Sequence, residues 1–383
     1  MLVAFLGFAA GATAANLYYS QPLLHAISTH FRSNAGWASI ISVATQLGYG
    51  SGLLVLLPLG DSVERRTLIA GSILGTALML LGTALCTSLP FLIFLSYLLG
   101  LICVTPQLVV TYAAGIAQPS TRGRTVGTVM SGLLIGILFS RSVSGFIGAR
   151  AGWQAVYFMA AGCMLVLALL SVLVLPPQQP ERRVPYRRLL CSLWPILRRE
   201  PVVQRHALIG ALGFGSFSVF WTTLAFYLAG RPEHFDSQIA GFFGLVGVAG
   251  AMVAPLAGRL SDRFSPRIVN GMALGLVVVS FMVMGLAPYA LVWLVIGVFL
   301  MDAGVQASQI SNQTRIYALP AELRSRINAV YMVCYFFGGA LGSALGSWAW
   351  AHYQWRGVCA AGVALAAIGL SVLFSPFFRQ SRI

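Results

Sequence analysis

The segment RGRTVGTVM (residues 122–130) returns as RSRINAVYM (residues 324–332), a shift of 202 positions. A tryptophan follows each segment at the same shift, because Trp153 in GWQAVYF corresponds to Trp355 in QWRGVCA. Self-similarity at one fixed shift is the mark of an internally repeated architecture. The sequence therefore predicts two similar halves.

A third match places Asp61, in LGDSVERR, opposite Asp262, in RLSDRFSPR, at a shift of 201 positions. The stretch between the halves is rich in proline and arginine. We predict an N-terminal bundle over 1–177, a basic cytoplasmic linker over 178–204 and a C-terminal bundle over 205–383. The Leu, Trp and Ile residues among the linker arginines fit a helix lying on the inner membrane surface. A solvated charged linker is the alternative.

The composition is that of a membrane protein, because 58% of the residues are hydrophobic, 9% are charged and the mean hydropathy is +0.83. A spanning helix needs ~20 predominantly apolar residues. Such runs occur at 2–24, 36–57, 67–87, 90–113, 125–148, 153–175, 205–229, 238–258, 268–287, 289–313, 327–350 and 357–377. We predict an all-α membrane protein with twelve transmembrane helices in two pseudo-symmetric six-helix bundles.

The arginines indicate the orientation of the chain. All 24 basic residues are arginine, and the cytoplasmic loops of membrane proteins carry an excess of basic residues. With both termini in the cytoplasm, 19 arginines fall on the inner side, four (Arg32, Arg150, Arg231 and Arg356) on the outer side, and Arg141 inside a span. We expect a multi-pass membrane protein with both termini in the cytoplasm. The scattered arginines predict no nucleic-acid partner.

Sequence motifs of enzymes are absent. The chain contains no HExxH, GxSxG, GxGxxG or CxxC motif, which are the patterns of metalloproteases, hydrolases, dinucleotide-binding folds and redox or zinc sites. It has no lysine for ATP binding or for a Schiff base. The six cysteines are dispersed. The sequence therefore predicts no enzyme activity, no cofactor and no metal site.

Several segments resemble the major facilitator superfamily. GRLSDRFSPR, after the eighth predicted span, is similar to the signature loop of that superfamily, and LGDSVERR stands at the equivalent place in the first half. ANLYYSQPLL, TVMSGLLIGI and GVQASQISNQTRIYAL resemble a bacterial branch close to the drug and sugar proton antiporters. The resemblance implies twelve helices, alternating access and export.

Three places depart from the pattern of the family. Ser62 and Glu64 stand where the loop after the second span usually has arginine and glycine, which predicts an atypical gate in the first half. Ser96 takes the place of an arginine in the fourth span, so proton coupling through that arginine is excluded. Arg141, in GILFSRSVSG, replaces the proline of the fifth-span antiporter motif.

Arg141 and Asp302 are the ionisable residues that we place deep in the bilayer. A charge at this depth is costly and persists mainly where it faces a cavity or a partner. One interpretation is a permanent ion pair that only fixes how the halves pack. The other is a proton-coupling pair, in which Asp302 exchanges a proton and Arg141 controls when it does so.

Asp302 also begins a polar stripe in the tenth predicted span. Gln306, Gln309 and Gln313 follow it at i+4, i+7 and i+11, and these positions share one helix face. In the resembled family this helix lines the central cavity, which implies that Gln306 and Gln309 contact substrate or water. Gln313 and Asn312, near the inner end, fit hydrogen bonds between helices equally well.

Further cavity candidates lie on other spans. The polar candidates on the opposite wall are Asn16, Tyr19, Gln21, Gln46 and Gln107. Tyr19 fits an interfacial aromatic belt equally well. Trp221, with Phe217, Phe220 and Tyr227, supplies the aromatic surface that an apolar ligand requires, although aromatic residues in a span more often serve packing.

Small residues recur at every fourth position in two spans. They are Gly132, Gly136, Ser140, Ser144 and Gly148, and then Gly338, Gly342 and Gly346. Such ridges let helices approach closely. Charged residues gather at inner helix ends, and the predicted inner gate consists of Asp61, Arg65, Arg66, Asp262 and Arg263. The alternative is charge that only sets the topology.

The sequence predicts a secondary active transporter that exports a small molecule, such as a drug-like compound, a sugar or a nucleoside, by alternating access and proton antiport. An uncoupled facilitator or an importer of a small metabolite is the alternative, because Ser96 removes a familiar coupling residue. A channel fits less well, because no filter loop or ring of charge is visible. The expected partners are the substrate, protons and the lipid bilayer, and the protein is expected to be monomeric.

Overall fold

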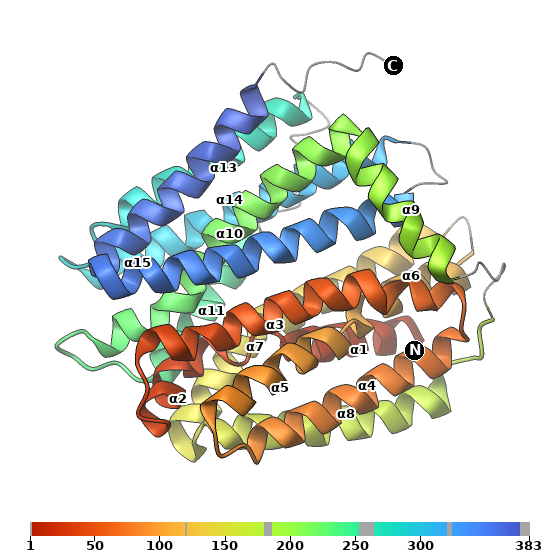
Figure 1. The fold of residues 1–383 in the computed structure, drawn as a ribbon, viewed down its shortest axis with the longest axis horizontal. Coiled ribbons are helices and arrows are strands. Elements are labelled where there is room, and N and C mark those ends of the chain that lie inside the picture. The colour runs from red at the N-terminus through yellow and green to blue at the C-terminus, as the bar shows by residue number, and fades with distance from the viewer. Residues whose placement is uncertain (1, 119–120, 180–185, 253–263, 320–323, 376–383) are drawn as a thin grey trace.

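The computed structural model describes residues 2–118, 121–179, 186–252, 264–319 and 324–375. Every regular element in these ranges is a helix (Figure 1). The first part of the chain contains α1 (Leu2–Ala15), η1 (Gln21–Leu23), α2 (Leu24–His30), α3 (Ala35–Val55), η2 (Leu57–Asp61), α4 (Arg65–Ala84), α5 (Leu89–Ile102), α6 (Thr105–Ile116), α7 (Arg122–Ala151) and α8 (Trp153–Val174). The second part contains α9 (Tyr186–Arg199), α10 (Pro201–Ala229), α11 (Ser237–Ala251), α13 (Pro266–Met284), α14 (Leu291–Tyr317) and α15 (Arg324–Phe374).

The helices fit an all-α membrane protein. Within the described ranges, nine helices are long and apolar enough to cross a membrane, and the last of them, Arg326–Phe374, covers the eleventh and twelfth predicted spans. Two shorter apolar helices, Leu2–Ala15 and Ser237–Gly250, stand where the first and eighth spans are predicted. The arrangement is consistent with twelve spans. Large apolar side chains such as Leu173 and Leu341 are more than 70% exposed, a surface that suits lipid and not water.

The first predicted span is broken. α1 ends at Ala15, and a turn precedes η1, where the sequence predicts one continuous helix over 2–24. The side chain of Asn16 stabilises the break, because its Nδ2 donates to the carbonyl oxygens of Ala12 (3.2 Å) and Thr13 (3.0 Å). The last carbonyl groups of a helix lack partners within the helix. Asn16 thus provides hydrogen-bond donors for the last carbonyl groups of α1.

Two other predicted boundaries differ from the observed ones. The fourth span is divided at Cys103 and Val104 into α5 and α6, and Pro106, which has no N–H to donate, stands near the start of α6. By contrast, α15 continues through the predicted loop between the last two spans. Its backbone is non-helical only at Gln354, where φ is 52° and ψ is −147°.

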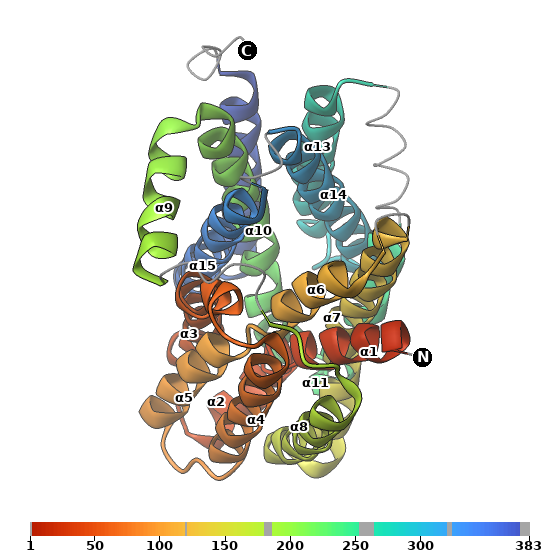
Figure 2. The same cartoon turned by 90° about the vertical axis from the view of Figure 1, so that its right-hand side faces the viewer.

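The helices form two groups. α1 to α8 form the lower group in Figure 1, α10 and α13 to α15 lie above them, and α11, which belongs with the upper group, lies between the two. Within the groups, α1 packs along α7, α3 along α5, α4 along α8, α10 along α15 and α13 along α14. α3 with α15 and α7 with α11 are the main contacts between the groups. Figure 2 shows both groups from the side of α9 and the N-terminus.

The predicted glycine ridges lie at close helix contacts. A Cβ added at Gly136 of α7 would overlap the backbone of Gly11 in α1, and one at Gly342 of α15 would overlap the backbone of Gly215 in α10. Only a residue without a side chain permits this approach. Both ridges are therefore packing faces.

The basic linker contains a helix, α9. The Tyr186 hydroxyl donates to the carbonyl oxygen of Val55 in α3 at 2.7 Å, while Leu193 and Ile196 are buried and Trp194 is 66% exposed. α9 also contacts α10 and α15. The linker therefore contains a helix that touches both groups, and its location on the inner membrane surface stays a prediction.

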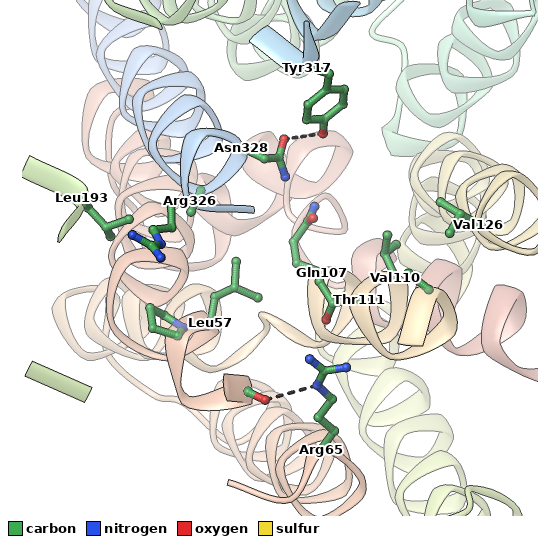
Figure 3. A pocket seen from close by; sticks show the side chains of 14 residues that line it. Leu57, Arg65, Gln107, Val110, Thr111, Val126, Leu193, Tyr317, Arg326 and Asn328 are labelled. Atoms are coloured by element: carbon green, nitrogen blue, oxygen red, sulfur yellow. Dashed lines mark hydrogen bonds between the residues drawn. The ribbon is translucent and has the colours of Figure 1, made fainter. Parts of the chain in front are cut away.

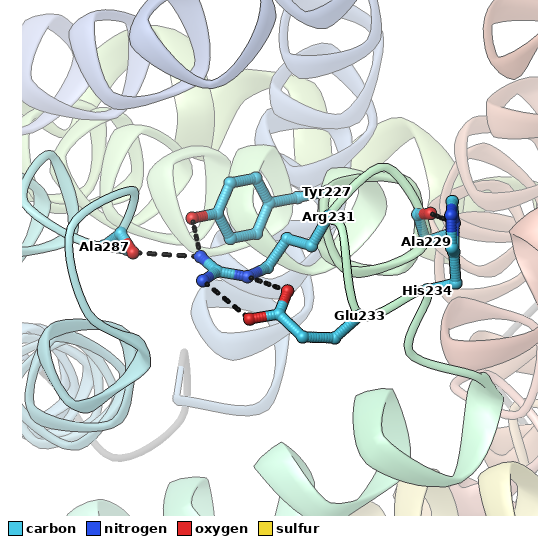
Figure 4. Close-up of polar contacts among 6 residues, drawn as sticks. All are labelled: Tyr227, Ala229, Arg231, Glu233, His234 and Ala287. Carbon is cyan, nitrogen blue, oxygen red and sulfur yellow. Dashed lines mark hydrogen bonds and ion pairs between the residues drawn. The ribbon is translucent and has the colours of Figure 1, made fainter.

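The loop between α10 and α11 is fastened by Arg231 (Figure 4). Its Nη1 donates to the Tyr227 hydroxyl and to the carbonyl oxygen of Ala287, both at 3.0 Å. Its Nε lies 3.3 Å from Oε2 of Glu233. The hydrogen bond from Arg231 holds the pKa of the Glu233 carboxyl below its ordinary value. Arg231 thereby joins α10 to the chain that follows α13.

Candidate functional site

A cavity of about 300 Å³ lies between the two groups of helices. Its amide-bearing residues are Gln107, Gln306, Gln309, Gln313 and Asn328. Its aromatic residues are Tyr18, Tyr49, Phe214, Phe217, Tyr317, Tyr335 and Phe336. None of the described residues that line it is charged. The volume is at the lower end of the ~300–1,000 Å³ range of ligand pockets, so the central cavity suits a small molecule with apolar and hydrogen-bonding parts.

A second cavity, of about 590 Å³, continues the first toward the end of the molecule where η2 and α9 lie (Figure 3). The two cavities share the lining residues Gln107, Val110, Val126, Tyr317 and Asn328. Arg65 and Arg326 line the second cavity, and within the described part of the chain the lining of both cavities contains no acidic residue. The central cavity therefore has a mouth with positively charged walls.

The structure places three of the predicted cavity residues on the cavity wall. Gln107 comes from α6, and Gln306 and Gln309 come from successive turns of α14. The Tyr335 hydroxyl donates to Oε1 of Gln309 at 3.2 Å, so the side chain of Gln309 is held from α15. That these amides contact substrate stays a prediction.

The other predicted cavity residues do not line the cavity. Asn16 faces α8, where its Nδ2 lies 3.4 Å from the Met164 sulfur. Gln46 joins α3 to the other group of helices, because its Nε2 donates to Ser343 Oγ at 3.1 Å and its Oε1 accepts from Ser218 Oγ at 3.4 Å. Tyr19, Gln21 and Trp221 are buried away from the cavity as well. On the first span, the neighbouring Tyr18 lines the cavity instead of Tyr19.

Arg141 of α7 is fully buried beside the central cavity. Its Nε donates to Oε1 of Gln21 at 2.7 Å, and its Cζ lies 4.8, 5.3 and 4.1 Å from the ring centres of Tyr18, Phe217 and Trp221. Aromatic faces attract a guanidinium. Both Nη1 and Nη2, however, are buried without a hydrogen-bond partner, an arrangement that buried charges rarely adopt.

Asp302 of α14 is 1% exposed, and both of its carboxylate oxygens are buried without a hydrogen-bond partner. It comes from the group of helices opposite to that of Arg141, and the two charges interact electrostatically. They are not hydrogen-bonded to each other. The structure thus brings the two predicted residues into one region without the direct ion pair that a purely structural role would use.

Four glycines of α11 make room for both charges. A Cβ at Gly244 would lie 2.9 Å from the Arg141 Cβ, and one at Gly247 would lie 3.1 Å from Oδ2 of Asp302. Gly241 and Gly250 lie against the backbones of α7 and α14 in the same way. A helix turns about 100° per residue, so glycines spaced by three drift by roughly 60° at each step. α11 therefore contacts α7 with one end of the series and α14 with the other.

The end of the molecule opposite the mouth is closed by bonds between α7 and α11. Ser142 Oγ donates to the carbonyl oxygen of Gly241 at 2.9 Å, and Ser237 Oγ donates to that of Gly145 at 3.2 Å. Arg150 Nη1 also donates to Oε1 of Gln238, at 3.2 Å. The sequence analysis missed these residues and the α11 glycines. The spacing of three from Gly241 to Gly250 is the signal that points to the contact face.

A separate polar cluster joins α10, α13 and α14. Oδ1 of Asn312 lies 2.8 Å from His206 Nδ1 and accepts from Asn270 Nδ2 at 2.8 Å, while Ser308 Oγ donates to Asn270 Oδ1 at 2.7 Å. Asn312 is therefore a residue that joins helices, whereas Gln313 lines the cavity. Among the described residues, no group of three histidine, cysteine or acidic side chains is placed to hold a metal ion.

The predicted inner gate is described in part. Arg65 lines the mouth, and its Nε donates to the carbonyl oxygen of Gly60 at 3.2 Å. Arg66 lines a separate pocket between α4 and α8. The side chain of Asp61, and Asp262 and Arg263 altogether, lie outside the described residues.

Known proteins share this fold. A bacterial homolog of the human lysosomal transporter Spinster, solved in an inward-facing and occupied conformation, matches with a TM-score of 0.76 at 14% identity over 97% of this chain and 95% of that chain. A D-xylose-proton symporter matches with a TM-score of 0.75 at 16% identity over 100% of this chain and 98% of that chain. At these identities the likeness concerns the fold alone.

Sequence comparison leads to the family. The uncharacterized transporter YgaY of Escherichia coli O157:H7 is 39% identical over 379 residues, which cover 99% of this chain and 96% of the relative. The family model of the Major Facilitator Superfamily matches residues 3–342. The chain therefore belongs to the major facilitator superfamily and is a membrane transporter, not an enzyme.

Proposed function

We propose that this transporter exports a small molecule by alternating access, in exchange for protons. The observation that carries the proposal is the pair of buried, unbonded charges, Arg141 and Asp302, which come from opposite groups of helices beside a central cavity. Isolated charges at membrane depth are costly and mark ion and proton pathways. A structural pair would be expected to bond directly.

The open end of the cavity is the cytoplasmic end in this proposal. The excess of arginines in the loops on the side of the termini supports a cytoplasmic location of both termini in a bacterial inner membrane, and Arg65 and Arg326 at the mouth lie on that side. The described conformation is then inward-facing. The bonds of Ser142 and Ser237 between α7 and α11 close the outer end.

Export requires that the outer end opens while the mouth closes. The hydrogen bonds between α7 and α11 lie beside the glycines of α11, Gly241, Gly244, Gly247 and Gly250, which we call the α11 seam. The two helix faces can therefore separate without repacking large side chains. Arg65 at the mouth forms the inner gate that closes in turn, together with Arg66 beside it in the sequence and with Asp61, Asp262 and Arg263. The protein carries out this cycle as a monomer.

The proton step uses Asp302. Facing outside, Asp302 takes up a proton, and facing inside it releases the proton while the substrate occupies the cavity. The charged partner proposed to act on Asp302 is Arg141 of α7, and Tyr335 of α15, whose hydroxyl bonds to Gln309, is a further titratable group near it. α11 presents no charged residue to it. The position of Arg141 therefore sets when the proton moves.

The substrate binds in the central cavity. The amide groups of Gln107, Gln306 and Gln309 are the proposed hydrogen-bonding contacts, and the aromatic residues are the apolar wall. Drug-like compounds, sugars and nucleosides combine these features.

An uncoupled facilitator, or an importer, is the second candidate. Ser96 favours it, because its Oγ donates to the carbonyl oxygen of Leu92 in the same helix at 2.7 Å and provides no charge in the fourth span. The two candidates differ in their response to a pH gradient.

The test is a flux assay in proteoliposomes, with and without an imposed pH gradient, screened over drugs, sugars and nucleosides. The proposal expects uphill accumulation of a substrate with the wild type under the gradient. Asp302→Asn keeps the shape and loses the titration, so this variant should exchange substrate at equal pH without accumulating it. Accumulation by Asp302→Asn on a proton gradient would contradict Asp302 as the coupling residue.

A further inference from the structure

Arg141 and Asp302 lie one helical turn beyond residues of the cavity wall. Arg141 follows Ile137 by four residues on α7, and Asp302 precedes Gln306 by four residues on α14. Residues four apart lie above one another on a helix face. Arg141 lies farther from the mouth than Ile137, and Asp302 lies farther from the mouth than Gln306. The blind end of the cavity is therefore backed by a cation on one side and a carboxylate on the other.

Two aromatic side chains separate Arg141 from the cavity. Tyr18 and Phe217 both line the cavity and both lie within 5.3 Å of the guanidinium carbon. Tyr18 belongs to the turn that interrupts the first span, and Phe217 to α10. Nη1 and Nη2 of Arg141 are buried behind these two rings without a hydrogen-bond partner.

Asp302 offers the opposite chemistry. Its two oxygens are unpartnered acceptors, and Gly247 and Gly250, which face it from α11, have no side chain. Buried donors and acceptors nearly always have a partner. The blind end is thus backed by two donor nitrogens of Arg141, Nη1 and Nη2, and by two acceptor oxygens of Asp302, Oδ1 and Oδ2, all without a hydrogen-bond partner.

We propose that the substrate is a small, net-neutral, bipolar molecule. Its acceptor or anionic group binds Arg141, its hydrogen-bond donor or cationic group binds Asp302, and its apolar body lies against the aromatic wall formed by Phe214, Tyr335 and their neighbours. Zwitterions of the amino-acid type and polyols share this chemistry. This inference rests on the proposed function, and it names the substrate class of the same cavity.

Bipolar recognition also explains why protons and substrate exclude each other. A protonated Asp302 loses its charge and accepts a donor group poorly, so the substrate leaves when the proton enters. A purely anionic substrate would behave in the opposite way, because it would bind Arg141 best when Asp302 is neutral and would travel together with the proton. A purely cationic substrate would have to pass Arg65 and Arg326 at the mouth. Charge complementarity therefore favours the bipolar class.

The test uses matched probes on the purified full chain, in lipid nanodiscs at equal pH on all sides. Three probes share a benzyl group: phenylalanine is the zwitterion, N-acetylphenylalanine is the anion and phenylalanine amide is the cation. Phenyl glucoside is the neutral polyol. The readout is the probe concentration needed to raise the thermal stability of the protein. At least one of the two bipolar probes should act at a concentration about tenfold or more below the single-charge probes, the difference expected for one added charge-assisted hydrogen bond.

Two variants should each weaken the bipolar probes and spare a different single-charge probe. We call this the crossed pattern, and misfolding cannot produce it. Asp302→Asn should weaken the bipolar probes about tenfold and leave the anionic probe unchanged or tighter. Arg141→Gln should weaken the bipolar probes and leave the cationic probe unchanged or tighter. Arg356→Gln, which removes an exposed arginine outside the cavity, is the charge-matched control and should behave as the wild type.

Three results would overturn the inference: a single-charge probe that binds the wild type best, no binding by either bipolar probe, or an unchanged probe profile in Arg141→Gln. The comparison of zwitterion with polyol decides between these two sources of bipolar chemistry. The binding assay contains no pH gradient. Loss of gradient-driven accumulation in the flux assay would contradict the proposed function, and loss of the crossed pattern would contradict only the substrate class.

Discussion

The guanidinium of Arg141 and the carboxylate of Asp302 are buried beside the same cavity, on opposite groups of helices, without a hydrogen bond between them. Arg141 is instead held by Gln21 and by the rings of Tyr18 and Trp221. Separation of two buried opposite charges costs free energy that a direct pair would recover. An arrangement of this kind suits groups whose partners change during a transport cycle.

Removal of the cation tests the role assigned to Arg141. Arg141→Gln keeps a hydrogen-bonding side chain but leaves Asp302 without its positive neighbour. Because a nearby cation favours the carboxylate over the acid, the pH profile of transport should move to higher pH than in the wild type. The measurement is substrate flux in proteoliposomes over a series of equal internal and external pH values. An unmoved profile would show that Arg141 does not act on the titrating group.

Gly247 tests whether the α11 seam positions Asp302. Gly247→Ala adds a Cβ that would lie 3.1 Å from Oδ2 of Asp302 and 3.2 Å from its Cγ, so the carboxylate has to move. A side chain forced from its preferred rotamer costs about 1 kcal/mol, and proton-driven flux should fall roughly fivefold. Gly275→Ala is the control, because nothing lies within 4 Å of the added atom. Equal flux in the two variants would show that the α11 glycines do not position Asp302 for transport.

The glycine ridges should be essential for transport and dispensable for membrane insertion. Gly136→Leu and Gly342→Leu place a side chain where the backbones of Gly11 and Gly215 already lie, and overpacking of this kind costs ~1–3 kcal/mol or more. We expect flux to fall by about tenfold or more at a normal amount of protein in the membrane. Gly162→Leu, an exposed position with open space around its Cβ, should retain flux. Wild-type flux in either ridge variant would contradict the packing argument.

The Arg231 loop gives a stability prediction that is independent of transport. Arg231→Gln loses hydrogen bonds to the Tyr227 hydroxyl and the Ala287 carbonyl, which should lower the free energy of unfolding by about 1–2 kcal/mol and lower the melting temperature in detergent. Glu233→Gln should stay close to the wild type, because exposed ion pairs contribute little.

The pH dependence of this pair has a defined sign. The pKa of Glu233 is held below its ordinary value, so its small stabilisation is present above the ordinary glutamate pKa and is lost as the pH falls through the lower folded-state value. A difference between wild type and Glu233→Gln that grows as the pH falls would contradict this assignment.

Local patterns in the sequence were sufficient for much of the architecture. Apolar run length predicts the spans, the spacing of Gln306 and Gln309 places both on the cavity side of α14, and the four-residue glycine spacing predicts the contacts of α7 and α15. Each of these properties repeats along a single helix. Helix periodicity therefore determines them without knowledge of any partner.

Features that depend on partners far apart in the chain could not be predicted. The break after α1 lies in a segment that remains apolar overall, so hydropathy continues through it, and this break carries Gln21 to Arg141. A polar side chain in a spanning helix needs a partner away from lipid. Asn16 and Gln46 find theirs on other helices and not in the cavity. Which neighbour a polar side chain meets depends on the crossing of helices and not on its own sequence context.

The most direct test of the central claim is the movement of protons caused by the substrate itself. Proteoliposomes without a pH gradient are loaded with a pH-sensitive dye, and the substrate identified in the flux screen is added outside. The account predicts that wild-type protein moves protons in the direction opposite to the substrate, and that Asp302→Asn transports substrate down its gradient with no proton movement. Proton movement by Asp302→Asn equal to that of the wild type, or protons moving in the same direction as the substrate, would contradict it.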